Sequence, residues 1–195
     1  MRGSVLGLVA LALVGGACGG DDESTGTTLT TTDTPITSGT RPVPVDDVAV
    51  VPNEITVDYL QLVLDEMYRI EGEVVQSLVA DGVDAEQVKR IDDLYSGELG
   101  ATFANDAIQL AADPSGLNDP PGQVGVEVTE LLSTDAGCAF AAVDLDFSGR
   151  APGGQVVESF IGIGVAEPPT NPTAWVMVVN GFNADGTAPE DPCAA

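Results

Sequence analysis

The residue of this sequence best placed to do chemistry is Glu71, a carboxylate that interrupts an apolar helical stripe. Within residues 57–80, apolar side chains recur on one side at helical spacing, and Glu71 projects into the middle of that side. A carboxylate in a partly desolvated pocket can accept a proton or bind the polar head of a ligand. Two interpretations without function remain open: Glu71 lies at a rim of the stripe, or it pairs with Arg69 or another base after a distortion at Gly72.

Two further carboxylates, those of Asp144 and Asp146, are two residues apart on an expected strand and so share one face. Such a pair can act as general acid and base, or can contribute to a metal site of the calcium type. The same alternation with Val143 and Leu145 is typical of a solvent-exposed outer face. We therefore treat the two aspartates as weak metal candidates.

The aromatic residues give the candidate binding surface. Glu71, Tyr68, Phe160 and Trp175 are the residues we expect at a ligand site, with the carboxylate as its polar point. The alternative is that the aromatic rings simply pack in the core.

Composition excludes several classes of function. The chain has no histidine, so a Ser-His or Cys-His catalytic pair is impossible. Its formal net charge of -25, from 31 acidic and 6 basic side chains, repels phosphate backbones and argues against nucleic-acid binding. We expect no cofactor.

The N-terminus carries an export signal. Arg2 precedes the apolar run 5–14, which is too short to span a bilayer, and the small residues Gly15 to Ala17 come directly before Cys18. This segment resembles that of bacterial lipoproteins, although Gly15 stands where they usually carry an aliphatic residue. The resemblance implies a signal peptide over 1–17 and acylation of Cys18, with palmitate among the chains, which would anchor the protein to the outer face of the cell membrane. Ordinary secretory cleavage after Ala17, which would release a soluble protein, is the alternative.

If Cys18 carries lipid, Cys138 and Cys193 remain as a pair. In an oxidising compartment we expect them to form a disulfide that holds the C-terminal tail on the sheet. Two free thiols or a metal site are the alternatives. A structural zinc site needs about four ligands, however, and two distant cysteines do not supply them.

Between export signal and domain, residues 18–50 form an expected tether, whose part from Ser24 to Thr40 is rich in threonine. A single domain is expected over 51–195. It begins with three helices, over 57–80 with Thr56 as N-cap, from Asp84 to Gly97, and over 98–112. From Val124 the period changes to two, and four strands are expected, the last three over 138–147, 155–166 and 174–182.

Helices followed by strands joined through short loops indicate an α+β fold, with the helices on one face of a curved, four-stranded antiparallel sheet. This order of elements resembles the NTF2-like (cystatin-like) fold over residues 51–182. The resemblance implies a bent sheet around a long first helix and a cone-shaped pocket between them. Gly162 and Gly164 are the positions where the sheet would bend most easily.

We therefore expect a lipid-anchored extracytoplasmic domain of non-enzymatic type that binds a small apolar ligand or an envelope protein in the helix–sheet cleft. An accessory or structural subunit with a filled core is one alternative. The other is a proton-transfer enzyme of the NTF2-like kind with Glu71 as its base.

Overall fold

The structure is a computed structural model that describes residues 47–183 and 186–194. The chain divides into Met1–Arg41 and Pro42–Ala195, and all described residues belong to the second unit. The signal peptide, Cys18 and most of the tether therefore lie outside the described residues. Within the described part, no helix has both the length and the apolar character needed to cross a membrane.

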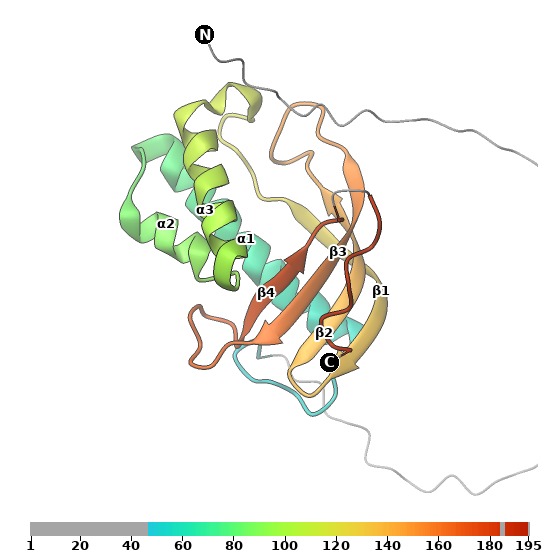
Figure 1. Cartoon of the computed structure of the whole chain (residues 1–195). Coiled ribbons are helices and arrows are strands. Elements are labelled where there is room, and N and C mark those ends of the chain that lie inside the picture. Colours follow the sequence, from blue (N-terminus) through green and yellow to red (C-terminus); the bar gives the residue numbers. More distant parts are fainter. Residues whose placement is uncertain (1–46, 184–185, 195) are drawn as a thin grey trace, which may run out of the picture. The chain divides into compact units, whose positions relative to one another are not determined.

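Within residues 47–183 and 186–194, three helices precede four strands, which confirms the α+β prediction (Figure 1). The strands form one antiparallel sheet in the order β1-β2-β3-β4, so each strand pairs with its neighbour in the sequence. The elements are α1 (Val57–Asp81), α2 (Ala85–Asp92), α3 (Gly97–Ala112), a short 3-10 turn (Pro114–Gly116), β1 (Gly125–Asp135), β2 (Cys138–Asp146), β3 (Val156–Val165) and β4 (Trp175–Asn180).

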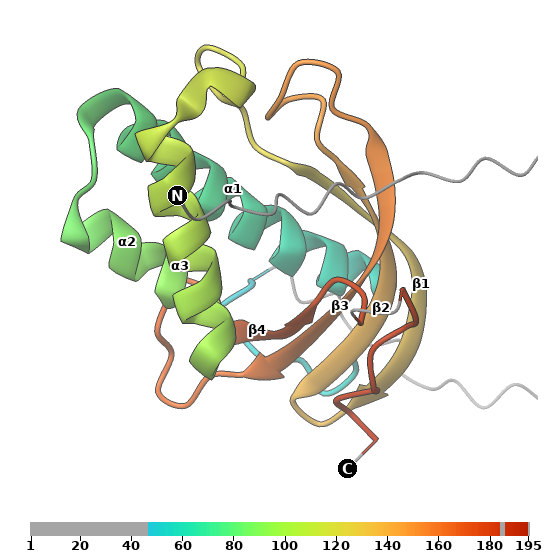
Figure 2. The ribbon, with the colours of Figure 1, turned by 45° about the horizontal axis from the view of Figure 1, so that its top comes forward.

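The sheet is curved, and all three helices lie on its concave side (Figure 2). Register shifts occur twice in β1, between Val128 and Glu130 and between Leu131 and Ser133. A third shift lies between Gly162 and Ile163 where β3 meets β4, at one of the two glycines expected to ease the bend. Because bulges increase local twist and bend a strand, these positions account for much of the curvature.

Helix α1 follows the sequence prediction at both ends. The Thr56 hydroxyl accepts a hydrogen bond from the Tyr59 amide at 3.2 Å. At the other end Gly82 has a φ of 89° and its amide donates to the Leu78 carbonyl, an arrangement that glycine adopts without strain. The apolar stripe of α1 is buried against the sheet, while α2 and α3 pack against α1 and against each other.

The second helix is shorter than predicted. We expected it to continue to Gly97, but it ends at Asp92. The reason is non-local, because the chain that follows pairs with Met177 of β4: the Met177 amide donates to the Leu94 carbonyl and its own carbonyl accepts from Ser96. Gly97, with a φ of 52°, instead begins α3.

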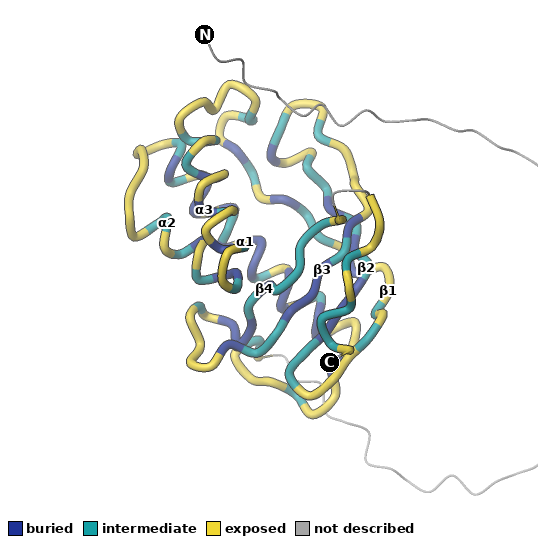
Figure 3. Tube along the Cα trace, viewed as in Figure 1, coloured by how far each residue is buried: buried dark blue, intermediate teal, exposed yellow. Residues whose placement is uncertain are grey.

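The hydrophobic core lies between α1 and the inner face of the sheet (Figure 3). Odd-numbered residues of β2, from Ala139 to Leu145, point into it. The largest fully buried side chains are those of Trp175, Leu60, Leu64, Met67, Leu78 and Ile91.

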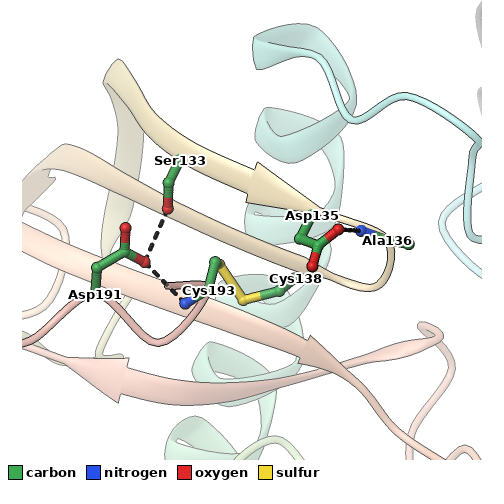
Figure 4. Close-up of a disulfide and its surroundings, with 6 residues drawn as sticks. All are labelled: Ser133, Asp135, Ala136, Cys138, Asp191 and Cys193. Atoms are coloured by element: carbon green, nitrogen blue, oxygen red, sulfur yellow. Dashed lines mark hydrogen bonds between the residues drawn. A yellow bond between two sulfur atoms is a disulfide. The ribbon is translucent and has the colours of Figure 1, made fainter. Parts of the chain in front are cut away.

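The C-terminal tail is fixed to the outer face of the sheet. Cys138 and Cys193 form a disulfide with a Cα–Cα distance of 5.5 Å, which confirms the predicted pairing (Figure 4). Asp191 supports it, because its Oδ1 accepts hydrogen bonds from the Ser133 hydroxyl and the Cys193 amide, both at 2.8 Å. A side chain at Gly162 would collide with Pro192 of this tail.

Candidate ligand-binding cavity

A cavity of about 380 Å³ lies on the concave side of the sheet. Its walls come from α1, α3, the β2–β3 hairpin and the end of β4. They are mainly apolar, with contributions from Val75, Phe103, Leu110, Leu145, Phe147 and Phe182. This volume and composition are within the range of small-molecule sites.

An ion pair between Glu71 of α1 and Arg150 of the β2–β3 hairpin forms one polar wall. Arg150 Nη1 lies 3.4 Å from Glu71 Oε1, and the two side chains are only 7% and 13% exposed. The guanidinium is positioned by the segment that leads into β1, since its Nε donates to the Gly122 carbonyl at 3.0 Å. Glu71 can therefore interrupt the apolar stripe because the β2–β3 hairpin supplies its positive partner.

Three buried polar atoms at this cavity have no hydrogen-bond partner among the described residues. They are Glu71 Oε2, Arg150 Nη2 and the hydroxyl oxygen of Tyr95. Each unpaired buried group costs about 1–3 kcal/mol, and native proteins contain few of them. Three such atoms in one cavity, from three separate segments, indicate a place for a polar group of a ligand or for water.

The tyrosine hydroxyls at this wall stay protonated well above neutral pH. Burial raises the pKa of Tyr68 and of Tyr95 above the usual value, and the negative charge of Glu71 raises both further. The side chain of Asn180 donates to the Tyr68 hydroxyl at 3.5 Å. Asn180 acts in the opposite direction on the pKa of Tyr95, although the Tyr95 hydroxyl has no hydrogen-bond partner of normal geometry among the described residues. Both phenols are thus available as hydrogen-bond donors.

Of the residues expected at a ligand site, Glu71 and Tyr68 line the cavity, whereas Phe160 and Trp175 lie elsewhere. Trp175 is fully buried in the core, where its indole Nε1 donates to the Tyr59 hydroxyl at 2.8 Å. Phe160 is on the outer face of the sheet because it is an even-numbered residue of β3. Its ring packs between those of Phe140 and Phe182, at centroid distances of 5.9 and 5.2 Å.

Asp144 and Asp146 also lie on the outer face, away from the cavity. Asp144 is opposite Glu127 of β1 and Glu158 of β3 in the sheet register. Asp146 accepts a hydrogen bond from the Ser148 amide at 2.8 Å, which begins the hairpin loop. Within the described ranges, no three acidic or cysteine side chains are gathered in a group that could hold a metal ion.

Sequence reasoning missed Arg150 and Asn180. The one available signal for Arg150 was its rarity, as one of 6 basic residues beside 31 acidic ones. No local period connects it with Glu71, which is 79 residues away. Arg69, the nearer candidate partner, instead pairs with Glu66 and Glu73 on the exposed side of α1.

Comparison with models of known protein families gives no match, and comparisons with curated proteins and with solved structures give no significant match. The geometry of the cavity is therefore the basis for assigning a function.

Proposed function

We propose that this protein is a non-enzymatic binding domain that holds a small, largely apolar ligand in the cavity between α1, α3 and the sheet. The observation that carries the proposal is the coincidence of an apolar cavity with three unpartnered buried polar atoms. Apolar walls supply the free energy of binding through burial, and a few fixed polar groups orient the ligand.

We further propose that the domain is of the NTF2-like kind and that it is displayed on the outer face of the cell membrane. The long helix α1 across the concave side of a bent sheet supports the first point. The resemblance of the N-terminal segment to lipoprotein signals, ending at Cys18, supports the second. Retention of the protein in the membrane fraction, and its loss in a Cys18→Ala variant, would test the anchor.

The cavity favours this function over an accessory subunit with a filled core. An envelope protein that inserts a side chain into the cavity would use the same polar atoms.

The test is native mass spectrometry of the protein purified from its own host. We expect an added mass that remains under native conditions and disappears on denaturation. A variant that fills the cavity, Ala107→Phe, should lose this mass, whereas an exposed control, Gln76→Phe, should keep it. A bare mass for the unaltered protein would contradict the proposal and would favour the accessory subunit.

A further inference from the structure

The polar wall of the cavity has a specific hydrogen-bonding pattern. An ionised carboxylate only accepts hydrogen bonds and a guanidinium only donates them. Glu71 Oε2 therefore requires a donor from the ligand, and Arg150 Nη2 requires an acceptor. Oε2 shares its carbon with Oε1, and Nη2 shares its carbon with Nη1, so both free atoms belong to the two groups that form the ion pair.

The charge of this wall is balanced. Glu71 and Arg150 pair at 3.4 Å and are both largely buried, so together they present no net charge to the cavity. A ligand anion would satisfy Arg150 but would place a second negative charge beside Glu71. A ligand cation would satisfy Glu71 but would oppose Arg150. Either ion would also lose its hydration without a full counter-charge, which is costly in a buried site.

The opening of the cavity adds to the selection against anions. Asp106 of α3 lines the cavity and is exposed. It belongs to a chain with a formal net charge of -25, and such an excess of negative charge lowers the local concentration of anionic ligands.

From these observations we infer that the ligand carries an uncharged head with an N–H donor beside a C=O acceptor, as in a carboxamide, a lactam or a urea, on an apolar body. The N–H donates to Glu71 Oε2, and the carbonyl accepts from Arg150 Nη2. The Tyr95 hydroxyl, which is also buried and unpartnered, donates to the second lone pair of the same carbonyl. This inference rests on the proposed binding function and specifies its ligand class.

Four probes with the same naphthalene body test the inference by calorimetric titration of the intact protein. They are naphthalene-2-carboxamide, its N,N-dimethyl derivative, naphthalene-2-carboxylate and 2-naphthylmethylammonium. We expect the primary carboxamide to bind at least about tenfold more tightly than each of the others, because only it meets both hydrogen-bonding requirements without a charge.

A charge-neutralising variant sharpens the test. In Glu71→Gln the guanidinium loses its counter-charge, so the carboxylate probe should become at least as tight a ligand as the carboxamide. The matched control is Glu54→Gln, the same chemical change at an exposed position outside the cavity, and it should leave the order of the four probes unchanged. If Glu71→Gln does not fold, the relative affinities of the four probes for the unaltered protein still test the inference.

The outcomes separate the inference from the proposed function. Equal affinity for all four probes, or preference for a charged one, would overturn the inference and leave the cavity as a binding site. The absence of binding by every probe would overturn the inference as well. Together with a bare native mass, it would also overturn the proposed function.

Discussion

At the scale of single residues, the burial of Glu71 depends on one guanidinium that comes from a distant loop. The sequence predicts that Glu71 is exceptional, because a carboxylate breaks an otherwise apolar helical period. It does not predict Arg150, because a hairpin loop has no period that would place its side chains relative to α1. The candidate site was thus half predictable: the residue that needed a partner could be found, but the partner could not.

The first prediction concerns that pair. Glu71→Leu leaves Arg150 buried without a counter-charge, so we expect the free energy of unfolding to fall by about 3 kcal/mol. The double variant Glu71→Leu/Arg150→Met replaces both charges by apolar groups and should recover most of that loss. Urea denaturation of the three proteins measures both effects. A more stable Glu71→Leu protein would show that the ion pair contributes nothing to the fold.

The second prediction concerns alkaline pH. Burial raises the pKa of Tyr68 and Tyr95 in the folded protein, so both remain protonated when the unfolded chain begins to lose its phenolic protons near pH 10. Stability from these groups is complete below that pH and falls above it, by about 1.4 kcal/mol per pH unit for each tyrosine. Unfolding curves between pH 9 and 11.5 should show this decline.

The double variant Tyr68→Phe/Tyr95→Phe should decline less steeply over the same range. Absorbance near 295 nm gives an independent check, because tyrosinate should form late in the folded protein and near pH 10 in denaturant. Early ionisation of all tyrosines in the folded state would show that the two hydroxyls are open to solvent.

At the scale of elements, some helix ends are determined by the local sequence and others by contacts with distant parts of the chain. The period and the caps of α1 are local signals, and the structure follows them. The end of α2 is decided by hydrogen bonds between the segment around Tyr95 and Met177 of β4. A contact between positions more than 80 residues apart leaves no mark in the local sequence, so this boundary could not be predicted.

The third prediction concerns the closest approach between α1 and the start of the sheet. A β-carbon on Gly72 would lie 2.7 Å from the β-carbon of Gln123 and 3.0 Å from its α-carbon. Gly72→Ala should therefore destabilise the protein by about 1–3 kcal/mol, although alanine favours helix formation. The exposed control Gln76→Ala on the same helix should change stability little. Thermal unfolding of both variants checks this, and a stabilised Gly72→Ala protein would contradict the close approach.

At the scale of the whole molecule, the fold class was predictable because the hydrophobic period changes from helical to alternating once, near Val124. Short loops then leave an antiparallel meander as the simplest sheet, and the observed order β1-β2-β3-β4 is that meander. The cavity was not predictable in the same way, because its volume depends on how closely the side chains of α1, α3 and the sheet pack together. The disulfide was predictable from the number of cysteines, once the N-terminal segment was interpreted as an export signal.

The fourth prediction concerns this disulfide. The bond joins residues 55 positions apart, for which the chain-entropy model gives about 4 kcal/mol of stabilisation. Cys138→Ser and Cys193→Ser should each lose about that amount, and the double variant should lose no more than either single one. Chemical denaturation with a free-thiol assay provides the measurement. Two reactive thiols in the unaltered, exported protein would contradict the pairing.

The same bond closes the chain between Cys138 and Cys193 into a covalent ring that contains all of β2, β3 and β4, and the tail. The exposed hairpin loop around Gly153 lies inside this ring. A protease that cuts there opens the ring but releases no fragment, since the two pieces stay joined through sulfur. A single cut in this loop therefore leaves a nicked protein whose two pieces separate on a gel only after reduction.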